Sequence, residues 1–256
     1  YVLVSASLQD MLRAYVDRHG DDLTGFADFH AIQLNDTHPT MAIPELIRLM
    51  MNEGYDFGTA FDTARRTFRY TNHTVMREAL ECWDLRLMNE LSPELVKVVR
   101  RIQSKLDRDL KKAKVADPAP YAIIDEGKRV HMANLAVYGS SYTNGVAAIH
   151  SQILKDDVFR EWYTLYPERF NNKTNGITQR RWLGLCNPEL TALLADKLKS
   201  DAFLTDLFAL KDLKPLIDDD LAQQFIEVKA EKKRQLAELI LEREGVEIPP
   251  HFVFDV

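Results

Sequence analysis

Apolar side chains recur at three- and four-residue spacing along much of the chain, which predicts amphipathic helices. The first helix is capped at Ser7, has Leu8, Met11, Leu12 and Tyr15 on one face, and ends at Gly20. Further helices are predicted over residues 40–53, 57–66, 92–110, 146–155, 187–199 and 219–243. The last has an apolar side that we expect to be buried, formed by Leu221, Phe225, Val228, Leu236, Leu239 and Ile240.

Short apolar runs lie between these helices and predict strands. They cover residues 1–5, 30–35, 68–71, 135–139 and 252–256. Strands that alternate with helices are typical of a mainly parallel sheet, so the fold class is a helix-rich α/β protein. Two of these runs lie at the ends of the chain. They are either terminal strands of a natural domain or strands at the cut ends of a longer protein, and the pattern leaves both open.

Polar loops follow three of the predicted strands. Asp36 and His38 follow the run at 30–35, His73 and Thr74 follow the run at 68–71, and residues 140–145 follow the run at 135–139. Ligands bind parallel sheets outside the carboxyl ends of the strands, so we expect a site there. Asn, Asp, His and Thr side chains bind sugar hydroxyls or polarise a leaving oxygen.

Each candidate also has a simpler structural interpretation. Asp36 and His38 fit a turn that caps the following helix, and His73 fits a buried histidine bonded to backbone. Asp36, His38, His73 and His150 would bind a metal only if their loops converged, which would suit a metal-dependent hydrolase. The chain has no helical His-x-x-x-His pair and no cysteine pair, so we expect no metal.

Two further features are open to more than one interpretation. Ser140 and Ser141 lie between glycines that suit a phosphate cradle, but the loop matches neither the P-loop nor the dinucleotide fingerprint. Trp182 is either a stacking platform or a core residue, and tryptophans are mostly buried.

Composition narrows the classes of function. The net charge of −6 gives no reason to expect a nucleic acid or an anionic membrane as partner. Only two cysteines, Cys82 and Cys186, are present, which excludes a disulfide framework and favours a cytoplasmic compartment. No apolar run has the roughly 20 residues needed to cross a bilayer.

Four strings occur in an order that resembles the glycogen, starch and maltodextrin (α-glucan) phosphorylase family. They are Gln33-Leu-Asn-Asp36-Thr-His38-Pro39, Tyr70-Thr-Asn-His73-Thr74-Val75, Asn144-Gly145-Val146-Ala-Ala-Ile-His150-Ser151 and Asn172-Lys-Thr-Asn175-Gly176-Ile-Thr-Gln-Arg-Arg-Trp182. The resemblance covers the whole chain. Gln179 and Arg77 stand where many family members have proline, which suggests a divergent branch.

The resemblance implies a two-domain glycosyltransferase with twin Rossmann-like domains and a pyridoxal phosphate cofactor. It also implies that the parent enzyme is a homodimer. Such enzymes cleave terminal α-1,4-linked glucose from an α-glucan with inorganic phosphate, giving glucose 1-phosphate with retention. No carboxylate acts as nucleophile in this family.

The resemblance also implies roles for individual residues. His73 and Asn175 match catalytic-site residues that contact the glucosyl unit. Thr74, beside His73, and Val146, through its backbone, match substrate contacts. Asp36 and His38 match residues at or near the sugar subsites. Trp182 matches a tryptophan beside the cofactor.

The family pattern places further groups beyond Val256, among them the phosphate-binding arginine and lysine and the lysine that forms the Schiff base with the cofactor. On this interpretation residues 1–170 are the second half of an N-terminal domain, and residues 171–256 are the opening helical part of a C-terminal domain. We therefore expect this segment alone to be inactive. A remnant that only binds oligosaccharide is the alternative.

Overall fold

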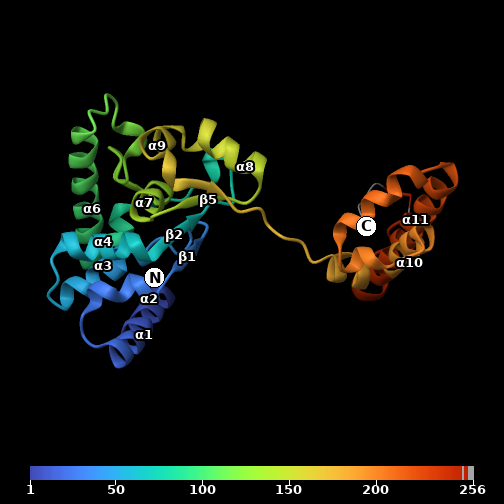
Figure 1. Ribbon diagram of the computed structural model, residues 1–256, viewed down its shortest axis with the longest axis horizontal. Helices are drawn as coiled ribbons and strands as arrows, with labels where there is room; N and C mark the ends of the chain where they lie inside the picture. Colours follow the sequence, from blue (N-terminus) through green and yellow to red (C-terminus); the bar gives the residue numbers. More distant parts are fainter. Residues whose placement is uncertain (250, 253–256) are drawn as a thin grey trace. The chain divides into compact units, whose positions relative to one another are not determined.

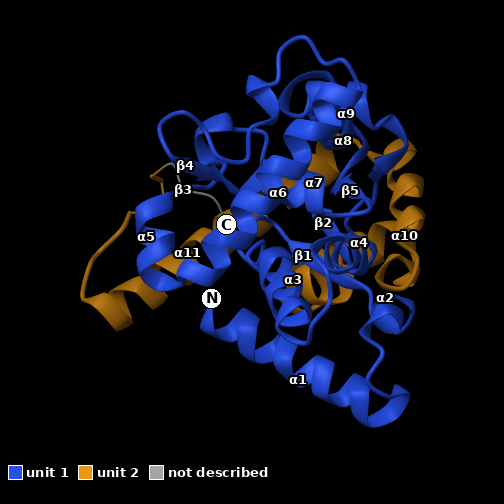
Figure 2. Cartoon of the chain, turned by 90° about the vertical axis from the view of Figure 1, so that its left-hand side faces the viewer, with its two compact units in different colours: residues 1–175 blue, residues 176–256 orange. Residues whose placement is uncertain are grey.

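The structure is a computed structural model that describes residues 1–249 and 251–252. It confirms a helix-rich α/β chain with a parallel sheet (Figure 1). The chain divides into two compact units, Tyr1–Asn175 and Gly176–Val256, coloured separately in Figure 2, and each is described by itself.

The first unit contains the strands. A four-stranded parallel sheet has the order β1-β2-β5-β6, and β3 pairs antiparallel with β4. The strands are β1 Ile32–Asn35, β2 Phe68–Thr71, β3 Cys82–Asp84, β4 Arg129–His131, β5 Thr143–Gly145 and β6 Phe170–Asn172. Because the four sheet strands run in the same direction, their carboxyl ends share one edge of the sheet.

Helices pack on this sheet and on one another. Those of the first unit are α1 Val2–His19, α2 Phe26–Phe29, α3 Ala42–Asn52, α4 Phe57–Thr67, α5 Leu85–Leu91, α6 Pro93–Lys112, α7 Met132–Gly139, α8 Ala148–Ile153 and α9 Arg160–Leu165. Helices α4 and α7 contact β2, and α8 contacts β5 and β6. The clearest stripe in the sequence, on α6, is confirmed: Leu95, Val99, Ile102 and Leu106 are fully buried.

In the second unit, the regular structure of the described residues is helical. It contains α10 Pro188–Leu198 and α11 Asp219–Glu244, together with a π-helical segment Arg180–Leu185 and 3₁₀ segments Ala202–Leu204 and Leu207–Leu216. The prediction that the apolar side of α11 is buried is wrong. Only Leu221 of that set is buried, and Phe225 and Leu239 are 44% and 39% exposed.

The predicted strand at residues 1–5 is wrong, because α1 already begins at Val2. Ser5, Leu8, Leu12 and Tyr15 are buried at helical spacing, so the helical stripe extends back past the expected cap at Ser7. Packing of α1 on α3 outweighs the modest cost of β-branched residues in a helix. The run at 252–256 lies almost entirely outside the described residues, and its interpretation as a strand stays a prediction.

The predicted strand at 135–139 is also wrong, since these residues form the end of α7. Leu135, Ala136, Val137, Tyr138 and Gly139 are all buried, so this helix has no polar side to reveal its period. The strand of this region is β5, inside the polar stretch that was expected to be a loop.

Candidate functional site

The carboxyl edge of the parallel sheet carries four loops. They follow β1 at Asp36, β2 at Asn72, β5 at Val146 and β6 at Lys173. Asp36, His38, His73, Thr74, Val146 and Asn175, which sequence reasoning selected, all belong to these loops. The predicted sugar-contacting residues therefore lie in loops that follow neighbouring strands of one sheet.

A continuous chain of hydrogen bonds joins three of these loops. The Thr74 N–H donates to Asn72 Oδ1 at 2.9 Å, and His150 Nε2 donates to the same oxygen at 3.1 Å. The Val146 N–H donates to His150 Nδ1 at 3.0 Å, and the Asn175 N–H donates to the Val146 carbonyl at 2.9 Å. The structure thus brings Thr74, Val146 and Asn175 into one bonded network.

His150 is the centre of this network, and its protonation is determined by its partners. A backbone N–H can only donate, so Nδ1 must accept and Nε2 must carry the single ring proton. Burial lowers the pKa of His150, a hydrogen bond that the ring donates to the Thr74 backbone raises it, and electrostatic repulsion from nearby His73 lowers it. The ring is therefore a neutral structural link. His150 lies in one of the quoted strings, but nothing in the sequence indicated this role.

Asn72 directly follows β2, is fully buried and belongs to the same network. Its Nδ2 donates to the Tyr70 hydroxyl at 3.0 Å while its Oδ1 accepts the two bonds already described. Burial raises the pKa of Tyr70, so this hydroxyl stays protonated. Every polar atom of the Asn72 amide group is thereby used inside the protein.

The His73 ring contacts Asn35, the last residue of β1. Its Nε2 lies 2.6 Å from Asn35 Oδ1, an acceptor, so Nε2 donates and a neutral ring presents Nδ1 as an acceptor. The His73 side chain is exposed, so the interpretation as a buried histidine bonded to backbone is wrong. The orienting role of Asn35 was missed, although it lies within the first quoted string.

Asp36 and His38 form a small cluster with Glu81. Asp36 has a φ of 62° and accepts the Thr37 N–H at 2.8 Å, so it stabilises a tight turn. It does not cap the next helix, whose N-cap is Met41 without a side-chain bond, and that part of the turn interpretation is wrong. His38 Nδ1 lies 3.2 Å from Glu81 Oε1, and Thr37 Oγ1 donates to Glu81 Oε2 at 2.5 Å.

Gly145 determines how closely β5 approaches α8. A Cβ atom at this position would lie 2.9 Å from both the backbone N and the Cα of Ser151 and 2.5 Å from its hydroxyl. Because backbone atoms cannot move aside cheaply, only glycine fits here. His150 immediately precedes Ser151, so the close approach lies beside the hydrogen bond between the Val146 N–H and His150 Nδ1.

Ser140 and Ser141 do not form a phosphate cradle in this fold. Ser140 is fully buried, and both the N–H and the hydroxyl of Ser141 donate to the Phe68 carbonyl. Within residues 1–249 and 251–252, no group of three or more His, Cys, Asp or Glu side chains is arranged to hold a metal ion. His73 and His150 are instead bonded to amide and backbone groups.

Trp182 belongs to the second unit, in the Arg180–Leu185 segment. Its side chain is 69% exposed, so the interpretation as a core residue is wrong. In the part of the chain that the structure describes, no helix is long and apolar enough to span a membrane.

The fold and this edge define an α/β chain with histidine and amide groups positioned at the carboxyl ends of a parallel sheet, where polar ligands bind. The carbohydrate phosphorylase family model matches residues 1–256, and the chain belongs to this family.

Curated relatives agree across the whole chain. It is 42% identical to a maltodextrin phosphorylase of Streptococcus pneumoniae and 42% identical to the brain form of glycogen phosphorylase of Ovis aries. It is 40% identical to the muscle form of glycogen phosphorylase of Homo sapiens. Each match covers 100% of this chain but only 33%, 32% and 32% of the respective relative, so the chain spans about a third of their length.

Proposed function

We propose that this chain carries the sugar-binding side of an α-glucan phosphorylase, an enzyme that releases terminal α-1,4-linked glucose as glucose 1-phosphate with retention. The observation that supports this most strongly is the bonded network of Thr74, Asn72, His150, Val146 and Asn175 at the carboxyl edge. It holds the predicted sugar contacts rigid before a ligand arrives, which lowers the entropic cost of binding.

The network limits which atoms could contact a sugar under this proposal. The Val146 N–H is already used by His150, so a backbone contact to a hydroxyl must use the second lone pair of the Val146 carbonyl. His73 presents Nδ1 as an acceptor and so binds a hydroxyl that donates. The exposed Asn175 side chain offers both a donor and an acceptor, which suits a hydroxyl of either orientation.

The proposed cofactor of the parent enzyme is pyridoxal phosphate, and its Schiff-base lysine is placed outside this segment. The residue here that fits such a group is Trp182, because an indole that is 69% exposed offers a flat apolar face to an aromatic ring. When bound, the cofactor supplies a phosphate group that exchanges a proton with the substrate phosphate. The proposed partners are an α-1,4-glucan, inorganic phosphate and, in the parent, a second copy of the chain.

Titration with maltoheptaose tests the sugar-binding part of this proposal in the full natural chain that carries these residues. His73→Ala and Asn175→Ala each remove a side-chain hydrogen bond to the sugar and leave the backbone network intact. We expect each to weaken binding about fivefold or more. His19→Ala, which alters an exposed histidine on α1, is the matched control and should bind normally. Unchanged affinity in both site variants would refute the assignment.

A second experiment tests whether the segment alone is inactive. The 256-residue segment, supplied with pyridoxal phosphate, phosphate and maltoheptaose, should form no glucose 1-phosphate, because the proposed phosphate and cofactor anchors lie outside it. Enzymatic detection of glucose 1-phosphate would overturn this. Sugar binding without turnover would favour the oligosaccharide-binding interpretation for the segment alone.

A further inference from the structure

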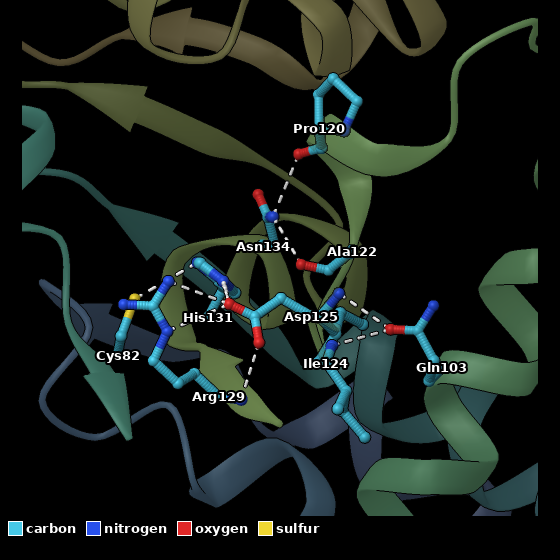
Figure 3. Close-up of polar contacts among 10 residues, drawn as sticks. Cys82, Gln103, Pro120, Ala122, Ile124, Asp125, Arg129, His131 and Asn134 are labelled. Atoms are coloured by element: carbon cyan, nitrogen blue, oxygen red, sulfur yellow. Dashed lines mark hydrogen bonds and ion pairs between the residues drawn. The ribbon is translucent and has the colours of Figure 1, made fainter. Parts of the chain in front are cut away.

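A cysteine, a histidine and an aspartate form a second cluster, at the β3–β4 pair. Cys82 and His131 are directly opposite each other in the antiparallel register, which places their side chains on the same face. Cys82 Sγ lies 3.2 Å from His131 Nδ1, and His131 Nε2 lies 3.0 Å from Asp125 Oδ2 (Figure 3). Each of the three side chains therefore contacts the next.

Asp125 is held as a carboxylate by its surroundings. The backbone N–H of Arg129 donates to Oδ1 at 2.8 Å, and the Arg129 guanidinium donates to Oδ2 at 3.1 Å. The Arg129 backbone, together with the His131 and Arg129 side chains, holds the pKa of Asp125 at about 2 against the opposing effect of burial. A carboxylate only accepts, so His131 Nε2 must be the donor.

That bond determines what Nδ1 can do. With the ring proton on Nε2, the neutral imidazole presents the lone pair of Nδ1 to the Cys82 thiol. Burial raises the pKa of this thiol, partly offset by the nearby charge of Arg129, so the resting sulfur is protonated and needs a base to react. Protonation of Nδ1 gives an imidazolium that Asp125 faces with a full negative charge.

The cluster opens on a cavity. A volume of about 740 Å³ is lined by Cys82, His131, Arg129, Asn134, Arg77 and Phe159. The Cys82 side chain is exposed, and Asn134 is held in place by bonds from its Nδ2 to the carbonyls of Pro120 and Ala122 (Figure 3). A small organic molecule therefore has room to reach the sulfur.

We propose that Cys82, His131 and Asp125 form a nucleophilic site, distinct from the sugar edge, that adds to small α,β-unsaturated carbonyl compounds. The thiol proton passes from Sγ to His131 Nδ1, and the sulfur lone pair forms a bond to the β-carbon. The carbon–carbon π bond breaks to give an enolate, which takes the proton back from Nδ1 at its α-carbon. Atoms and charge balance, and no oxidant or second reactant is needed.

The in-chain control is Cys186. Its side chain is also exposed, and no histidine or carboxylate bond to its sulfur is found among the described residues. We expect acrylamide to modify Cys82 about tenfold faster than Cys186 in the full natural chain, with each rate measured by mass spectrometry of the corresponding peptide. Equal rates, or faster modification of Cys186, would overturn the proposal.

Two variants separate base catalysis from simple shielding. His131→Gln removes the base, so we expect the Cys82 rate to fall to about that of Cys186. If His131 only covered the sulfur, the same change would speed modification instead. Asp125→Asn keeps an acceptor for the Arg129 N–H but no longer forces the proton onto Nε2, so the Cys82 rate should fall while the Cys186 rate stays constant. An unchanged Cys82 rate in both variants contradicts the assigned roles.

Discussion

His150 at the sheet edge and His131 in the β3–β4 pair have the same tautomer but different partners. His150 Nδ1 accepts from a backbone N–H and Nε2 donates to an amide oxygen, so a second proton would break the bond to Val146. His131 Nδ1 faces a thiol and Nε2 faces a carboxylate, so a second proton can come from one partner and be balanced by the other. The partners, rather than the ring, decide which histidine is structural and which is reactive.

The largest expected effect comes from removing the structural histidine. His150→Leu leaves the Val146 N–H and the buried Asn72 oxygen without this partner, and we expect unfolding to become easier by about 2 kcal/mol. His131→Leu, the matched change in the other network, should cost less than about 1 kcal/mol because Asp125 keeps its bonds to Arg129.

Urea denaturation of both variants checks this difference. His150→Gln is the rescue variant, because an amide side chain also offers one acceptor and one donor. It should recover part of the lost stability. Equal losses for His150→Leu and His131→Leu would remove the distinction between the two networks.

The next largest effect is expected at Gly145, where β5 approaches α8 closely. Gly145→Ala forces a Cβ against the Ser151 backbone, and we expect a loss of about 1–2 kcal/mol together with weaker maltoheptaose binding. Gly176→Ala is the control, since nothing lies within 4 Å of its added Cβ. Thermal denaturation and sugar titration of the two variants measure both effects, and similar behaviour would show that the approach at Gly145 is not critical.

The sequence predicts a helix well where one side of the helix is polar. It does not distinguish a helix from a strand where every side is buried. The stripes at residues 40–53, 57–66 and 92–110 correspond to α3, α4 and α6. The buried run at 135–139 has the same composition as a central strand, and only the packing of α7 against β2 and α4 separates the two.

The site was predictable as a set of loops but not as a network. The predicted strand ends before Asp36 and His73 lie at the carboxyl edge of the sheet, whereas Asn175 was selected only through the family resemblance and follows β6, a strand that was not predicted. The roles of Asn72, His150 and Glu81 depend on contacts between residues far apart in the sequence, such as Thr37 with Glu81, 44 positions apart, and Asn72 with His150, 78 positions apart. Such pairs become visible only once the register of the sheet is known.

A smaller loss of stability is expected from changing Tyr70, which bonds to Asn72. Tyr70→Phe removes the hydroxyl that accepts from Asn72 Nδ2 and leaves a buried amide donor without that partner. We expect a loss of about 1 kcal/mol in the free energy of unfolding. Tyr142→Phe, at a side chain that is 48% exposed, should change it by less than about 0.5 kcal/mol. Urea midpoints test this, and a neutral Tyr70→Phe would show that Asn72 is held by its oxygen alone.

The smallest effect is a pH dependence that only the structural histidine should produce. Burial lowers the pKa of His150 below its ordinary 6.5, so the unfolded chain binds a proton there more readily than the folded chain. Its contribution to stability is therefore complete above about pH 6.5 and is lost as the pH falls through the folded pKa. The fall in urea midpoint between about pH 7.5 and about pH 5.5 should be larger in the wild type than in His150→Gln. The repulsion that His73 exerts on the charged form of His150 is absent in His150→Gln and is part of the expected difference. An equal fall in both would mean that His150 takes up its proton without breaking the bond to Val146, and the contrast with His131 would then disappear.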